Sequence, residues 1–246
     1  MTSLEVDGAP LEHHLARPPG SVRGRARCGL VIAHGMPLGE GAAADAAVTL
    51  PELADRVARD TGWLALAFSF RGAGRSPGAF SPGGWLEDLR GAVELLRAET
   101  PSVFIAGFGL GGALALRATA ADPSVGGVAA LGAPADLNAA SADPGRVVAC
   151  AVASGYRSAA DPVDLDAWAE ELRAVDPSGA AASVPPRPLL LVHGSIDPLV
   201  PVVDARVLSD AAEGSAELRV VGMAAHRLRH DPRAVALLLG WLQRQG

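Results

Sequence analysis

The 246-residue chain contains no lysine, so all of its 21 basic residues are arginine. Without lysine, Schiff-base chemistry, a lysine general base and a phosphate-binding P-loop are excluded. Only 2 cysteines occur, Cys28 and Cys150, and they stand in no metal-binding spacing. So few cysteines are typical of a reducing compartment, and we expect a cytoplasmic protein.

Targeting, membrane and metal signals are scarce as well. Residues 1–10 lack the basic and apolar regions of a signal peptide, and no apolar run reaches the roughly 18 residues of a membrane helix. The net charge of −6 argues against nucleic acid or an anionic membrane as the main partner. The 6 histidines pair with no cysteine or glutamate at ligand spacing. We therefore expect a small-molecule partner, no metal site and no cofactor.

What the chain does contain is an alternation of apolar runs and amphipathic segments. The apolar runs predict buried strands at Cys28–Ala33, Trp63–Phe70, Val103–Ala106, Val125–Leu131, Pro188–Val192 and Ala216–Val221. Between them, helices are predicted at Leu53–Asp60, Trp85–Glu99, Ala113–Ala121 and Val203–Ala212, and a final helix at Pro232–Arg244 follows the last strand. This order predicts an α/β fold, with a mostly parallel sheet and helices on both faces.

Two segments depart from the alternation. Asp7-Gly8 separates the strand candidates Leu4–Asp7 and Leu11–Leu15, which predicts a hairpin. Residues 136–185 hold one helix, Asp166–Val175, and are interpreted as an insertion over the carboxyl edge of the sheet, where α/β sites lie. One face of that helix carries Trp168, Leu172 and Val175. That face either lines a pocket or packs the insertion on the domain.

A glycine-rich run lies between the third predicted buried strand and its helix. Gly107-Phe108-Gly109-Leu110-Gly111-Gly112 matches the nucleophile elbow G-x-S-x-G, except that Gly109 stands at the nucleophile position. The run also matches the dinucleotide fingerprint G-x-G-x-x-G, which needs an acidic residue at the end of the next strand. That strand ends in Gly132, and Asp136 follows only four residues later, past a proline. The motif alone therefore leaves the two interpretations nearly even, and the rest of the chain has to separate them.

Other polar residues follow predicted strands. His34-Gly35-Met36-Pro37 forms a loop that can aim a backbone N–H at a developing oxyanion. Arg71 and Arg75, in a glycine-rich turn, either bind substrate or are solvated. Asp197 follows one strand and His226 the next, and parallel neighbours would bring the two together. These pairs and loops are the candidate catalytic features.

The glycine-rich run, the acid Asp197 and the histidine His226 follow one another in this order along the chain. With these features the chain resembles the α/β-hydrolase-fold superfamily, in particular its small esterase, lipase and peptidase-like members. The resemblance spans residues 3 to 245. It implies one domain over 1–246, with approximately 136–185 as a cap insertion. It also implies that Asp197 is the triad acid, that His226 is the triad base and that Met36 and Leu110 supply the oxyanion hole. Three further residues are substrate-binding candidates: His34, Arg71 and Trp168.

The departure from the family is Gly109, because the family uses serine, cysteine or aspartate as nucleophile. Glycine relieves much of the elbow strain of about 1–3 kcal/mol, so the turn is expected to persist. Other serines lie on other segments, namely Ser76, Ser81, Ser102 and Ser195. His230, the competing histidine, is expected to be solvated or to cap a helix.

Three hypotheses follow from Gly109. In the first, an Asp197–His226 dyad acts without covalent catalysis on a small ester, thioester or other carbonyl substrate, with water in the vacated space. In the second, the chain is an inactive pseudo-hydrolase that serves as a binding protein. In the third, a parent serine hydrolase carried serine at position 109.

Overall fold

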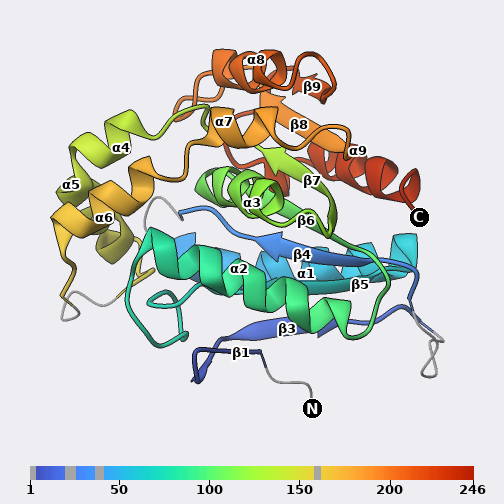
Figure 1. The fold of residues 1–246 in the computed structure, drawn as a ribbon, viewed down its shortest axis with the longest axis horizontal. Coiled ribbons are helices and arrows are strands. Elements are labelled where there is room, and N and C mark those ends of the chain that lie inside the picture. Colours follow the sequence, from blue (N-terminus) through green and yellow to red (C-terminus); the bar gives the residue numbers. More distant parts are fainter. Residues whose placement is uncertain (1–3, 20–25, 37–41, 158–161) are drawn as a thin grey trace.

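A seven-stranded sheet forms the centre of the protein in the computed structural model, which describes residues 4–19, 26–36, 42–157 and 162–246 (Figure 1). The strand order is β3-β5-β4-β6-β7-β8-β9, and all strands are parallel except β3, which pairs antiparallel with β5. The strands span His13–Ala16 (β3), Gly29–Ala33 (β4), Leu64–Phe68 (β5), Val103–Phe108 (β6), Val125–Leu131 (β7), Leu189–Gly194 (β8) and Glu217–Val221 (β9). The predicted α/β architecture is confirmed.

Helices cover both faces of this sheet. Alternate strand residues such as Leu30 and Ile32 pack on α1 and α9, whereas Val31 and Ala33 face the side of α2 and α3. Both faces are therefore buried, which explains why the strands read as continuous apolar runs. The helices are α1 (Ala42–Thr61), α2 (Pro82–Arg97), α3 (Leu110–Ala121), α8 (Val202–Ala211) and α9 (Pro232–Gln243).

Helix α1 begins well before the predicted start at Leu53. It runs for 20 residues and contains Pro51. The prediction stopped short because proline removes a helical hydrogen bond, but the alanine-rich segment before it has a high helix propensity. Ala46 and Leu50 are buried against the sheet, so packing stabilises the upstream turns.

The N-terminal hairpin is also shorter than predicted. Strands β1 (Glu5–Val6) and β2 (Ala9–Pro10) pair antiparallel around Asp7 and Gly8, both of which have positive φ. The expected strand Leu11–Leu15 is not the second arm. Its residues from His13 onward leave the hairpin and join the edge of the main sheet as β3.

Residues 136–185 hold more helix than the single predicted one. Helices α4 (Asn138–Ala142), α5 (Pro144–Ala153) and α6 (Leu165–Arg173) pack on one another, and α6 also packs on α2. Helix α7 (Pro177–Ala182) instead packs on α3 and α8, beside the sheet. Residues 158–161 of this segment lie outside the described part of the chain. Among the described helices, none combines the length and the hydrophobicity needed to cross a bilayer.

Candidate active site

Gly109 occupies a sharp turn between β6 and α3. Its backbone has φ 54° and ψ −124°, in the left-handed range that side chains rarely adopt. A Cβ on Gly107 would lie 2.1 Å from the carbonyl oxygen of Gly111, so the strand and the helix approach too closely for a side chain there. The local geometry is that of a strand–turn–helix elbow, and the glycines are required to form it.

Asp197 and His226 meet beside this turn, as the sequence predicts. Asp197 follows β8 and His226 follows β9, and their Oδ2 and Nδ1 atoms lie 2.8 Å apart. The other carboxylate oxygen of Asp197 accepts hydrogen bonds from the backbone N–H groups of Leu199 and Val200 at 2.9 and 3.0 Å. The carboxylate is fully buried and held in place by these bonds.

His226 faces the position where a nucleophile would stand. A Cβ built on Gly109 would lie only 3.1 Å from Nε2 of His226. Because Nδ1 donates its hydrogen to the Asp197 carboxylate, Nε2 of the neutral ring carries a free lone pair. The imidazole can therefore accept a proton from a group that occupies the space above Gly109.

The loop after β4 lies against the elbow. The Cα of Gly35 is 4.0 Å from the Cβ position of Gly109, and a Cβ on Gly35 would clash with the carbonyl oxygen of Phe108 at 2.5 Å. Met36 and Leu110 both line a small cavity at this point. The two expected oxyanion-hole residues are thus brought together, whereas Pro37 of the same motif lies outside the described residues.

The same loop disfavours a dinucleotide at the glycine-rich run. A Cβ on Gly111 would lie 2.2 Å from the carbonyl oxygen of His34, so the first turn of α3 is already covered by backbone. A pyrophosphate needs open N–H groups at a helix N-terminus. The loop after β4 fills the space at the N-terminus of α3 that a pyrophosphate would need.

His34, a substrate-binding candidate, is buried behind the loop. Its Nδ1 lies 2.8 Å from the carbonyl oxygen of Gly35, and its Nε2 accepts the N–H of Phe70 at 3.2 Å. Burial lowers the pKa of His34 to about 4, so the ring is neutral near pH 7. These bonds tie the loop after β4 to the turn after β5.

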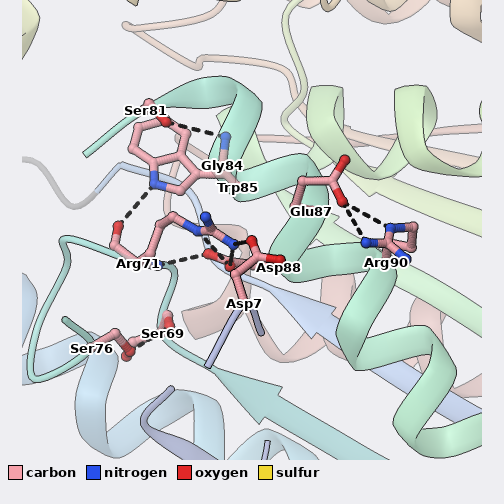
Figure 2. Close-up of polar contacts among 10 residues, drawn as sticks. All are labelled: Asp7, Ser69, Arg71, Ser76, Ser81, Gly84, Trp85, Glu87, Asp88 and Arg90. Atoms are coloured by element: carbon pink, nitrogen blue, oxygen red, sulfur yellow. Dashed lines mark hydrogen bonds and ion pairs between the residues drawn. The ribbon is translucent and has the colours of Figure 1, made fainter. Parts of the chain in front are cut away.

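Arg71 makes structural contacts (Figure 2), and it is not among the residues that line the cavity. Its guanidinium pairs with the buried Asp88 at 2.8 Å and with Asp7 at 3.1 Å. Its backbone N–H donates to Asp88, and its carbonyl oxygen accepts the indole N–H of Trp85. These contacts favour the structural interpretation of Arg71 over substrate binding. Arg75 is exposed and pairs with Glu12.

Trp168 packs α6 onto the domain. The side chain is 1% exposed, stacks on Phe80 and meets Trp85 edge-on. Leu172 and Val175 on the same face are also fully buried. None of these three residues lines the cavity beside Gly109. The packing alternative for this face is therefore favoured.

No serine replaces the missing nucleophile within the described residues. Ser76 donates to the carbonyl oxygen of Ser69, and Ser195 accepts the N–H of Met223. Ser81 caps α2.

His230 is exposed in a short 3-10 helix, Leu228–His230, and Asp231 rather than His230 caps α9.

Two residues of the site were missed by sequence reasoning. His193 is buried, with its Nε2 3.5 Å from Asp197 and 2.9 Å from the carbonyl oxygen of Val200. Tyr156 reaches the cavity from the segment after α5. His193 stands in the same turn motif as Asp197, which was its only signal.

In the described part of the chain, no cluster of three or more histidine, cysteine, aspartate or glutamate side chains is arranged to hold a metal ion.

Comparison with known proteins identifies the fold. No family sequence model matches the chain, and no curated protein sequence is significantly similar to it. A putative hydrolase from Agrobacterium vitis is 21% identical with a TM-score of 0.72, over 100% of this chain and 97% of that chain. The esterase domain of a Rhodothermus marinus protein is 26% identical with a TM-score of 0.69, over 99% and 98%.

A third similar structure is Est1E from Butyrivibrio proteoclasticus, which was solved with ferulic acid bound. It is 16% identical with a TM-score of 0.71, over 99% of this chain and 97% of that chain. These similarities extend over essentially the whole of each chain and include the parallel sheet and its helices. The protein therefore has the α/β-hydrolase fold.

Proposed function

We propose that the protein hydrolyses or otherwise transforms a small ester, thioester or related carbonyl compound by general-base catalysis without a covalent intermediate. His226 is the base, Asp197 orients it, and a water molecule takes the place of the missing serine hydroxyl. The single observation that carries this proposal is the 2.8 Å Asp197–His226 pair, with Nε2 of His226 aimed at the space above Gly109.

The reaction begins with the substrate carbonyl seated beside the elbow. His226 removes a proton from the water as the water oxygen attacks the carbonyl carbon, and negative charge develops on the carbonyl oxygen. The backbone N–H groups of Met36 and Leu110 are proposed to stabilise this charge. The protonated His226, stabilised by Asp197, then gives its proton to the leaving group.

The alternative is a binding protein that has kept the site but not the chemistry. Gly109 favours it, because the covalent route is closed without a side chain at this position. An intact oxyanion hole with bound substrate still retains a rate of roughly 10³–10⁴ over water in enzymes stripped of triad members. Weak turnover is therefore expected from the first proposal, and none from the second.

The deciding experiment measures hydrolysis of short-chain p-nitrophenyl esters by the protein and by His226→Ala. His230→Ala is the matched control, because His230 is an exposed histidine four residues away. Turnover that is lost in His226→Ala and kept in His230→Ala supports the dyad. Turnover that survives His226→Ala contradicts it, and a protein that is silent on a panel of ester and thioester substrates supports the binding role.

A further inference from the structure

The backbone N–H of Met36, one of the two proposed oxyanion donors, points where its peptide group is held. This N–H has no hydrogen-bond acceptor among the described residues, and Met36 lies beside the cavity at the elbow. The carbonyl oxygen of Gly35 and the N–H of Met36 belong to one planar trans peptide, so they point in opposite directions. A contact that fixes the Gly35 oxygen therefore also fixes the direction of the donor.

The ring of His34 makes that contact. Its Nδ1 lies 2.8 Å from the Gly35 oxygen, and a carbonyl oxygen only accepts, so Nδ1 carries the ring hydrogen and donates it. Burial lowers the pKa of His34 to about 4, so near pH 7 the ring is neutral and Nε2 has no hydrogen. Nε2 is left to accept hydrogen bonds, and the backbone N–H of Phe70 donates one at 3.2 Å.

Tyr156 holds this ring from a distant segment of the chain. It belongs to the insertion of residues 136–185, it is 5% exposed, and its hydroxyl oxygen lies 2.6 Å from each ring nitrogen of His34. Because Nδ1 donates to Gly35, the hydroxyl donates to Nε2 and favours the same tautomer. The two rings also meet edge-on. The backbone of Tyr156 is anchored as well, since its carbonyl oxygen accepts the N–H of Gly74 at 2.9 Å.

We propose that Tyr156 is a positioning residue of the oxyanion hole and acts through His34 on the N–H of Met36. The hydroxyl holds the imidazole, the imidazole holds the carbonyl oxygen of Gly35, and the planar peptide passes this constraint to the donor. The insertion thereby supports the chemistry at the elbow through a residue that does not itself touch the substrate. The assignment rests on the proposed function, because it takes Met36 as an oxyanion donor.

The mobility of the Met36 amide tests this assignment without requiring turnover. In protein labelled with ¹⁵N-methionine, Met36 and Met223 each give an amide signal, and the Met223 N–H is held separately by the hydroxyl oxygen of Ser195 at 2.8 Å. We expect the NMR order parameter of the Met36 N–H to be about 0.85, as in rigid backbone, and to fall towards about 0.6 in Tyr156→Phe. Met223 should keep the same value in both proteins.

Two further variants separate positioning from packing. Trp168→Phe disturbs the packing of α6 without removing a contact of His34, so the Met36 amide is expected to stay rigid. His34→Phe keeps an aromatic ring but removes both ring nitrogens, and it should loosen the Met36 amide. Adding Tyr156→Phe to His34→Phe should have no further effect, because the hydroxyl acts only through the imidazole. Circular dichroism confirms that each variant is folded.

The kinetics of p-nitrophenyl acetate hydrolysis provide the second readout. Tyr156→Phe is expected to lower kcat about 10-fold, a part of the roughly 10²–10³-fold that loss of an oxyanion donor costs, and to leave KM nearly unchanged. An unchanged kcat in a protein that turns over, a rigid Met36 amide in folded Tyr156→Phe, equal loosening in Trp168→Phe or further loosening on addition to His34→Phe would overturn the assignment. A Met36 amide loosened by Tyr156→Phe in a protein without turnover upholds the positioning and overturns only the catalytic proposal.

Discussion

Introducing a serine at position 109 tests the location of the site most sharply. A Cβ at this position would lie 3.1 Å from Nε2 of His226, so the imidazole must move back by a few tenths of an ångström. The side chain of His226 is 21% exposed, which leaves room for this movement. A serine hydroxyl would then lie within hydrogen-bond reach of the base.

The expected gain in rate is large. Removing the serine from an intact triad costs about 10⁶-fold in a serine protease, so adding one to a preformed dyad and oxyanion hole recovers part of that factor. We expect Gly109→Ser to raise p-nitrophenyl acetate hydrolysis by about 10²-fold or more. Because the new nucleophile forms an acyl-enzyme, the release of p-nitrophenolate should show an initial burst.

The same substitution has a cost in stability that a control variant separates from the gain in activity. A side chain at φ 54° introduces strain of about 1–3 kcal/mol. Gly109→Ala carries the same Cβ and the same strain, and it is expected to lose the same stability in urea unfolding without gaining activity. A folded Gly109→Ser that is no more active than Gly109→Ala would refute the placement of the site.

Three further outcomes are expected. Asp197→Asn should lower any turnover by about 10-fold or more, because the amide no longer selects the productive tautomer of His226. A kcat equal to that of the unaltered protein at every pH measured would contradict this expectation. Burial lowers the pKa of His34 to about 4, against about 6.5 in the unfolded chain, so the unfolded state binds the extra proton first and stability falls as pH drops from 6.5 to 4. The free energy of unfolding measured in urea should be about 2–3 kcal/mol lower at pH 4.5 than at pH 7 because of this group. The pH dependence of that free energy should be shallower in His34→Gln. Arg71→Met should destabilise the protein by about 3 kcal/mol or more, since it leaves the fully buried carboxylate of Asp88 unpaired, and Asp88→Leu in the same chain should recover part of that loss.

The parts of the site that the sequence predicts are those that strand ends position. Asp197 and His226 each follow a buried apolar run, and parallel pairing of β8 with β9 is enough to bring the two loops together. The elbow is equally local, because strand, turn and helix are contiguous in the chain around Gly109. In these cases the pattern of apolar runs contains the required information.

The parts that the sequence does not predict depend on contacts between distant segments. Tyr156 meets His34 across 122 residues, from a segment with no strand or helix periodicity to place it. Trp168 had two possible roles until its packing on Phe80 and Trp85 was known. The start of α1 was hidden by Pro51, because propensity rules do not register the burial of Ala46 and Leu50 against the sheet. Tertiary packing decides each of these outcomes.

The most direct test of the central proposal is the time course of p-nitrophenyl acetate hydrolysis by the protein with Gly109 in place, followed together with the intact mass of the protein. General-base catalysis by His226 predicts linear product release from the first turnover, no acyl adduct in the mass spectrum and loss of the reaction in His226→Ala. A burst of p-nitrophenolate with an acetylated protein, or no hydrolysis above the uncatalysed rate, would contradict it.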